Sequence, residues 1–152
     1  MKVTDILVRD ASLLDLAATD KEQVLAEMAR ALGAAEPTVD PEQLLAVLRE
    51  REELQSTGIG DGVAIPHGKL SGLERLLASF ARSPGVDFAA IDGEPTRLFF
   101  LLVVPEQSGG QHLKALARIS RFLRDERFRE KLVAAADLDE VFAAIEQEDA
   151  KF

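Results

Sequence analysis

Two histidines and one arginine are the residues of this chain best suited to chemistry. The chain has 152 residues, no cysteine and only two histidines, His67 and His112. A neutral imidazole is a good nucleophile near pH 7, because its pKa lies close to that range and one ring nitrogen carries a free lone pair. A histidine can therefore accept a phosphoryl group without a separate general base. Fixed positive charge and N–H donors would stabilise the oxygens of that group.

His67 lies in the glycine-rich stretch STGIGDGVAIPHGKL, residues 56–70. Pro66 fixes its own φ and favours an extended conformation in the residue before it. Gly68 would let the chain turn and would allow another group to approach the backbone closely. We expect GVAIP, residues 62–66, to form a short strand, with His67 at the point where that strand leaves the sheet. The alternative is a surface-turn histidine with no chemical role.

Arg51 and His112 are the residues expected to meet His67. Arg51 continues the apolar stripe of the helix that runs into the glycine-rich stretch, and His112 lies in the first turn of a later helix, facing inward with Leu116 and Ile119. All three would converge at one edge of the sheet. There Arg51 could hold phosphoryl oxygens and His112 could donate an N–H. Alternatively, Arg51 snorkels from its stripe to complement the helix C-terminus, and His112 is a partly buried, hydrogen-bonded histidine.

The elements that must position these residues follow from apolar periodicity and turn signals. Thr19 and Glu22 have the spacing of a capping box, and Asp40 with Pro41 predicts the start of a second helix. The first 18 residues favour a short edge strand and a turn, and residues 86–95 contain a turn at Asp92-Gly93. We predict helices at 19–35 and 39–55, strands at 62–66, 73–82 and 96–105, and helices at 111–125, 126–136 and 138–148.

The order of these elements indicates the fold class. Helices come first, then strands, then helices again, and the apolar run 98–104 predicts a strand buried on both faces. The sequence therefore predicts an α/β fold in which a mixed β-sheet is sandwiched between helices in a single domain, rather than a strictly alternating doubly wound fold.

Composition excludes several classes of function. The net charge of −9 disfavours a nucleic-acid partner, and no apolar run is long enough for membrane insertion, so a cytoplasmic location is the default expectation. TGIGDG lacks the spacing of a nucleotide-binding loop. A metal site from His67, His112 and Asp61 has no close ligand cluster to support it, and we expect neither a metal nor a cofactor.

The charged runs REREE and RFLRDERFREK indicate solvated helix faces; the second could also be a docking surface.

The motifs around His67 resemble a known family. AIPHG, with REELQSTGIG before it and FAAIDGEPTRLFFLLVVPE and HLKALARISRFLRD after it, is similar to the EIIA domains of the phosphoenolpyruvate-dependent phosphotransferase system, fructose/mannitol class. Within that class the chain looks most like the stand-alone nitrogen-regulatory branch. The resemblance extends from ILVRDASLLDL to LDEVFAAI, and implies one EIIA-type domain over residues 1–152 with a core at about 5–147.

The resemblance implies a phosphotransferase component that works through a covalent phosphohistidine. His67 would carry the phosphoryl group on Nε2, Arg51 would hold its oxygens, and His112 would be the second imidazole of the site. Asp61 stands where relatives often carry Asn, and an acid beside the pocket would slightly oppose phosphorylation.

The partners are implied by the resemblance as well. The donor would be an HPr-like phosphocarrier protein, and the output would be mainly regulatory, through proteins bound according to the phosphorylation state. A sugar-specific EIIA subunit that passes the phosphoryl group to a separate EIIB is one alternative. A binding module that keeps the fold but is never phosphorylated is another.

Overall fold

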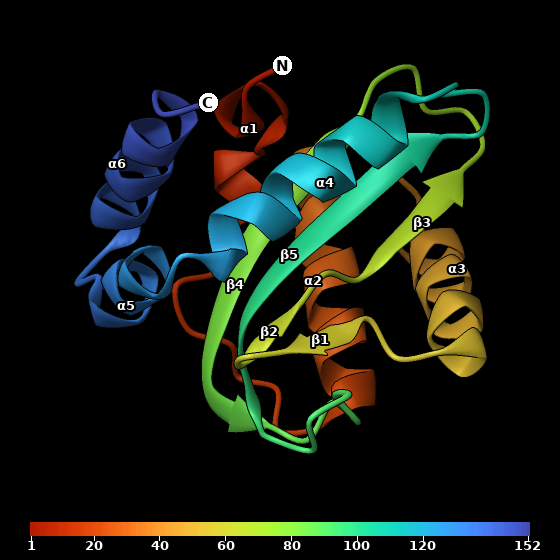
Figure 1. Ribbon diagram of the computed structural model, residues 1–152. Coiled ribbons are helices and arrows are strands. Elements are labelled where there is room, and N and C mark those ends of the chain that lie inside the picture. The colour runs from red at the N-terminus through yellow and green to blue at the C-terminus, as the bar shows by residue number, and fades with distance from the viewer.

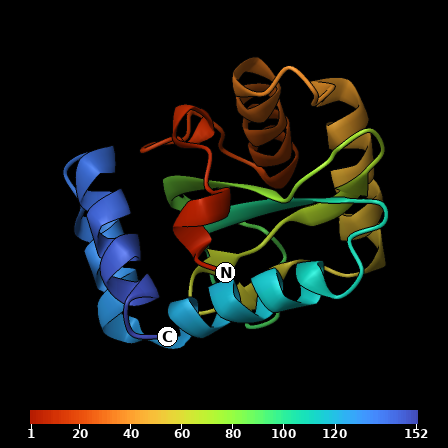
Figure 2. The same cartoon turned by 90° about the horizontal axis from the view of Figure 1, so that it is seen from above.

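A mixed sheet of five strands lies between two layers of helices in the computed structural model, which describes residues 1–152 (Figure 1). Figure 2 shows α2 and α3 on one side of the sheet and α4 on the other. The α/β sandwich predicted from the order of the elements is therefore confirmed. The strands are β1 (Gly58–Gly60), β2 (Val63–Ala64), β3 (His67–Leu70), β4 (Leu77–Val86) and β5 (Thr96–Pro105). The helices are α1 (Val3–Ile6), α2 (Lys21–Ala35), α3 (Pro41–Leu54), α4 (Gln111–Arg124), α5 (Glu126–Ala134) and α6 (Leu138–Asp149), with a 3₁₀ turn at Arg9–Ala11.

β5 is the central strand and divides the hydrophobic core in two. It pairs antiparallel with β4 on one side and parallel with both β2 and β3 on the other, while β1 pairs with β2. Phe99, Leu101 and Val103 pack with the apolar residues of α2 and α3. The alternate residues of β5, from Leu98 to Val104, pack with α1 and α4 to α6. The predicted strand with two buried faces is confirmed.

Helix starts follow the sequence signals with one exception. Pro41 opens α3, and the Asp40 carboxylate accepts a hydrogen bond from the N–H of Glu42 at 3.0 Å, as predicted. At α2 the predicted cap at Thr19 is wrong, because Asp20 is the N-cap and accepts from the N–H of Gln23 at 2.8 Å. An aspartate caps more strongly than a threonine, since its charge also interacts with the positive end of the helix dipole.

The strand predicted at residues 62–66 is broken in the structure. Only Val63–Ala64 pair as β2, and the chain pairs again as β3 from His67 to Leu70, which the sequence did not predict. Pro66 lies at the break, where it has no N–H to donate, but its carbonyl accepts from the N–H of Leu102 at 2.9 Å. Both β2 and β3 therefore pair with β5, one after the other along its length.

β4 begins and ends later than predicted, at Leu77 and Val86 instead of 73 and 82. The predicted strand stops at residue 82, just before the Ser83-Pro84-Gly85 segment. In the structure the register shifts there, and pairing resumes between Val86 and Thr96. A bulge accommodates the proline, because the bulged residues need no ladder hydrogen bond.

The N-terminal segment forms a one-turn helix in place of the expected edge strand. α1 donates two hydrogen bonds to a residue distant in the sequence, since the Asp149 carboxylate accepts from the N–H groups of Val3 at 2.8 Å and Thr4 at 3.0 Å. Leu7 and Leu13 make only isolated bridges to β4. The C-terminal helices form where they were predicted, although α5 ends at Ala134. None of the helices has both the length and the apolar character needed to cross a membrane.

Candidate functional site

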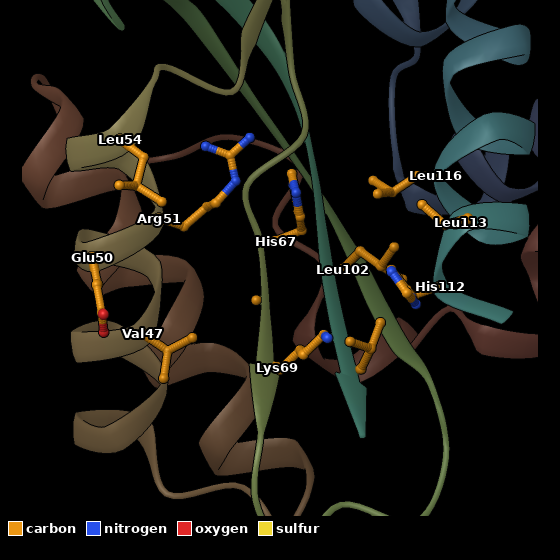
Figure 3. Close-up of a pocket in the computed structure, with 12 residues that line it drawn as sticks. Val47, Glu50, Arg51, Leu54, His67, Lys69, Leu102, His112, Leu113 and Leu116 are labelled. Carbon is orange, nitrogen blue, oxygen red and sulfur yellow. The ribbon is translucent and has the colours of Figure 1, made fainter. Parts of the chain in front are cut away.

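His67, His112 and Arg51 line a single cavity of about 480 Å³ between α3, the sheet and α4 (Figure 3). Arg51 comes from the last turn of α3, His67 from β3, and His112 from the first turn of α4. In Figure 3, Arg51 and His112 lie on opposite sides of His67. The three residues selected from the sequence are therefore brought together, although they come from three separate elements.

His67 starts a strand, so the expectation that it stands at a strand exit is wrong. It pairs with Leu102 in the interior of β5, because β5 continues past it and the chain pairs again after Pro66. The Nδ1 atom of His67 lies 2.8 Å from the carbonyl oxygen of Ile65. A carbonyl oxygen can only accept, so Nδ1 carries the proton and donates it. In this tautomer Nε2 has the free lone pair.

The pKa of His67 is lowered from its usual value of 6.5. Burial is the largest cause, because it disfavours the charged imidazolium, and the positive charge of Arg51 and the nearby His112 add to the effect. The hydrogen bond to Ile65 and the negative charge of Glu52 oppose it. The balance keeps His67 neutral, and therefore nucleophilic, at pH 7.

Arg51 both completes the end of its helix and lines the cavity. Its Nη1 donates to the carbonyl oxygen of Gln55 at 2.9 Å, so it complements the C-terminal end of α3. The same half-buried side chain lines the cavity beside His67. A guanidinium has five N–H donors, so the bond to Gln55 leaves others for an anion in the cavity.

His112 is half-buried in the first turn of α4 and is anchored by its neighbour in the preceding loop. Its Nδ1 lies 3.1 Å from the hydroxyl oxygen of Ser108. When the hydroxyl donates to Nδ1, the proton of the neutral ring resides on Nε2 and can be donated to a ligand. His112 also lies at a helix N-terminus without acidic residues in its first turn, an environment that favours anions.

Gly68 has a different function from the turn that the sequence suggested. It lies inside β3, and a Cβ atom at this position would overlap Cγ1 of Val47 in α3. The sequence predicted that another group would approach the backbone of Gly68 closely. The group that does so is the side chain of Val47. The absence of a side chain at Gly68 therefore lets α3 pack tightly against β3.

Glu52 is a buried residue of the site region that sequence reasoning missed. The REREE run was interpreted as a solvated face, yet the Glu52 side chain is only 6% exposed and its carboxylate lies 2.6 Å from the Nζ of Lys21. The interpretation is therefore wrong at this position. Glu52 is four residues after Leu48 and seven after Leu45, both buried, so the helical period could have placed it on the inner face.

Asp61 lies outside the site. It is exposed, has a left-handed φ of 57°, and lines a separate depression together with Arg97 and Arg129. The expectation that Asp61 stands beside the pocket is therefore wrong. No three His, Asp or Glu side chains are grouped closely enough to hold a metal ion.

Almost the whole chain matches one known protein family. Residues 5–148 match the family described as phosphoenolpyruvate-dependent sugar phosphotransferase system, EIIA 2. The chain belongs to this family. The resemblance inferred from the AIPHG motif is thus confirmed, and this EIIA domain is a component of a phosphoryl-transfer system.

Individual relatives of this EIIA domain come from both branches of the family. A nitrogen regulatory protein from Bradyrhizobium diazoefficiens is 44% identical over 147 residues, covering 95% of each chain. A fructose-specific EIIABC component from Bacillus subtilis is 35% identical over 98% of this chain, which corresponds to 24% of that longer protein. Among solved structures, the nitrogen regulatory protein IIA-Ntr from Neisseria meningitidis has a TM-score of 0.87 and 33% identity, covering 94% of this chain and 98% of that one.

Proposed function

We propose that this EIIA domain carries a phosphoryl group on Nε2 of His67. The observation that supports the proposal most directly is the 2.8 Å contact between His67 Nδ1 and the carbonyl oxygen of Ile65. It leaves Nε2 as the nucleophilic atom, in a cavity that also holds Arg51 and His112. A lowered pKa keeps the ring neutral, so that the lone pair is available at pH 7.

The transfer would proceed as an exchange of one P–N bond for another. The lone pair of His67 Nε2 forms the new bond to phosphorus while the bond from phosphorus to the donor nitrogen breaks, and that electron pair returns to the donor ring. His67 becomes more positive as it attacks, and the Nδ1–H bond to Ile65 stabilises that charge. Arg51 and the Nε2–H of His112 would stabilise the phosphoryl oxygens.

The surface around the cavity favours a protein as the phosphoryl donor. Four of the six exposed large apolar side chains border this region: Leu54 and Leu113 line the main cavity, and Ile59 and Ile91 line an adjoining one that His67 also borders. Apolar side chains gathered at one place indicate a surface that another protein covers. The donor proposed here is an HPr-like phosphocarrier in the cytoplasm.

Two outputs follow from the two kinds of relative. The similarity to nitrogen regulatory proteins over nearly the full length of both chains supports a mainly regulatory function, in which phosphorylation of His67 changes the affinity for partner proteins. The similarity to a fructose-specific EIIABC component supports a second candidate, transfer of the phosphoryl group to an EIIB domain. The chemistry at His67 would be the same in both.

The test is a phosphorylation assay with phosphoenolpyruvate, the upstream enzyme and the HPr-like protein. The wild-type chain should gain one acid-labile phosphate, with a ³¹P NMR signal of Nε2-phosphohistidine, and the His67→Ala variant should gain none. His112→Ala is the matched comparison, since it should fold and accept the phosphate more slowly. Labelling of His67→Ala to the wild-type level would refute the proposal. Passage of the phosphate to a purified EIIB would identify the sugar-transport output.

A further inference from the structure

A partly buried ion pair joins Lys21 in the first turn of α2 to Glu52 in the last turn of α3, one residue after Arg51. The Nζ of Lys21 is 2.6 Å from Glu52 Oε2, and the two side chains are 27% and 6% exposed. Lys21 is fixed further by the carbonyl oxygen of Phe88 at 3.3 Å and by the Phe88 ring, whose centroid lies 4.8 Å from Nζ. These contacts hold the Glu52 carboxylate in one place, on the inner face of the last turn of α3.

Glu52 in turn holds Thr57, the second residue of the glycine-rich stretch. The N–H of Thr57 donates to both carboxylate oxygens of Glu52, at 3.0 and 3.2 Å, and the Thr57 hydroxyl donates to Oε1. Thr57 is itself buried. Hydrogen bonds to a charged acceptor are about twice as strong as those between neutral groups. Thr57 is therefore firmly tied to the ion pair.

Two further hydrogen bonds connect Thr57 to the imidazole. The carbonyl of Thr57 accepts from the N–H of Ile65 at 3.1 Å, and the carbonyl of Ile65 accepts from Nδ1–H of His67 at 2.8 Å. The position of the Ile65 carbonyl therefore depends on Thr57, and through it on Glu52. This dependence matters because an imidazole that loses the bond at Nδ1 can take the other neutral tautomer, whose Nε2 carries a proton and cannot attack.

We propose that Glu52 is a positioning residue for His67. Held by Lys21, it keeps Thr57 and Ile65 in place, so that the Ile65 carbonyl selects the tautomer with a free Nε2. The proposal rests on the proposed function of His67 as phosphoryl acceptor. It adds a residue that touches neither the phosphoryl group nor the cavity, and acts through the backbone of the segment between α3 and β3.

The test compares Glu52→Gln with Glu53→Gln in the full chain. Glu53 is the adjacent, exposed glutamate and forms no hydrogen bond or ion pair. In Glu52→Gln, ¹⁵N NMR of the His67 ring should show a severalfold larger fraction of the tautomer protonated at Nε2. The rate of phosphoryl acceptance should fall about tenfold, with little change in KM, since small displacements of a reacting group are costly to the rate. Glu53→Gln should match the wild type in both measurements.

A second variant covers the case in which Glu52→Gln does not fold. The double variant Lys21→Met/Glu52→Met replaces the buried pair by apolar side chains of similar length, an exchange that proteins tolerate well. It should show the same change of tautomer. A wild-type tautomer ratio in a folded Glu52 variant would overturn the proposal. The tautomer measurement needs no phosphoryl donor, so a wild-type protein that is never phosphorylated would contradict the proposed function alone.

Discussion

Val47 of α3 packs directly against the backbone of Gly68 in β3, leaving no room for a Cβ atom at position 68. α3 carries Arg51, and β3 begins with His67. The contact between Val47 and Gly68 therefore sets how far the guanidinium lies from the imidazole. A residue with no side chain thus contributes to the geometry of the site, within the lining of the cavity itself.

Substitution at Gly68 should displace Arg51 from His67. In Gly68→Ala the added methyl group pushes α3 outward, so we expect a loss of about 1–3 kcal/mol in the free energy of unfolding and slower phosphoryl acceptance. Urea unfolding and the labelling rate measure the two effects. The double variant Gly68→Ala/Val47→Ala makes room for the methyl group and should recover most of the rate. Full activity in Gly68→Ala would show that the spacing of α3 and β3 is unimportant.

The charge of Arg51 should be visible in the titration of His67. Its guanidinium is one of the causes that lower the pKa of His67, so removing the charge in Arg51→Gln should raise that pKa toward 6.5. As the pH falls, the variant would therefore lose its neutral imidazole at a higher pH than the wild type. NMR titration of the His67 ring measures the shift. Arg49→Gln, which alters an exposed arginine on the same helix, is the control, and an equal shift there would contradict a specific effect of Arg51.

Leu113 should contribute to donor binding rather than to chemistry. Its side chain lines the cavity although the residue is 62% exposed. In Leu113→Ser a covering protein loses an apolar contact, so KM for the HPr-like donor should rise severalfold while kcat stays near the wild-type value. Ala143→Ser, on the exposed surface of α6, should leave both constants unchanged. A fall in kcat without a change in KM would place Leu113 in the reaction instead.

Asp149 should be the most sensitive acidic residue for stability. Its side chain is 2% exposed and accepts hydrogen bonds from Val3, Thr4 and Arg118. Replacement by Asn removes the charge that balances Arg118, and breaking a buried pair costs about 3–5 kcal/mol. Urea unfolding should show this loss. Asp139→Asn, at the exposed pair with Arg9, should cost less than about 1 kcal/mol, and equal losses in the two variants would argue against burial as the cause.

Local signals predicted most of the fold and the principal side chains of the site. The apolar run of β5 requires two covered faces, and Asp40 with Pro41 marks the start of α3 without reference to the rest of the chain. His67 and Arg51 could be selected because the chain has few histidines and because an arginine on an apolar stripe is unusual. Periodicity also placed His112 near them, on the inner face of α4.

The features that were missed depend on partners distant in the sequence. Gly68 in β3 lacks the strand preference of a β-branched residue, and the strand forms because β5 supplies a pairing edge. α1 has only one turn and is held by Asp149, more than 140 residues away. The spacing of Glu52 from Leu45 and Leu48 matches the buried face of α3, but its partner Lys21 is on another helix and could not be predicted. Such pairings arise from tertiary packing, and patterns in a single sequence do not show which distant residues will meet.

The hydrogen bonds that the backbone of α1 donates to the Asp149 carboxylate also bring the two ends of the polypeptide together. Figures 1 and 2 show the two ends near each other, the N-terminus at α1 and the C-terminus after α6. Phe152 stacks with Arg121 in the second half of α4, whereas His112 is in its first turn. Both ends thus emerge away from the cavity. A short peptide could join them in a circularly permuted protein, and the whole unit could be fused to or inserted into a larger protein with His67 still accessible. The positions of its two ends therefore make this EIIA domain suitable for fusion or insertion without blocking the cavity.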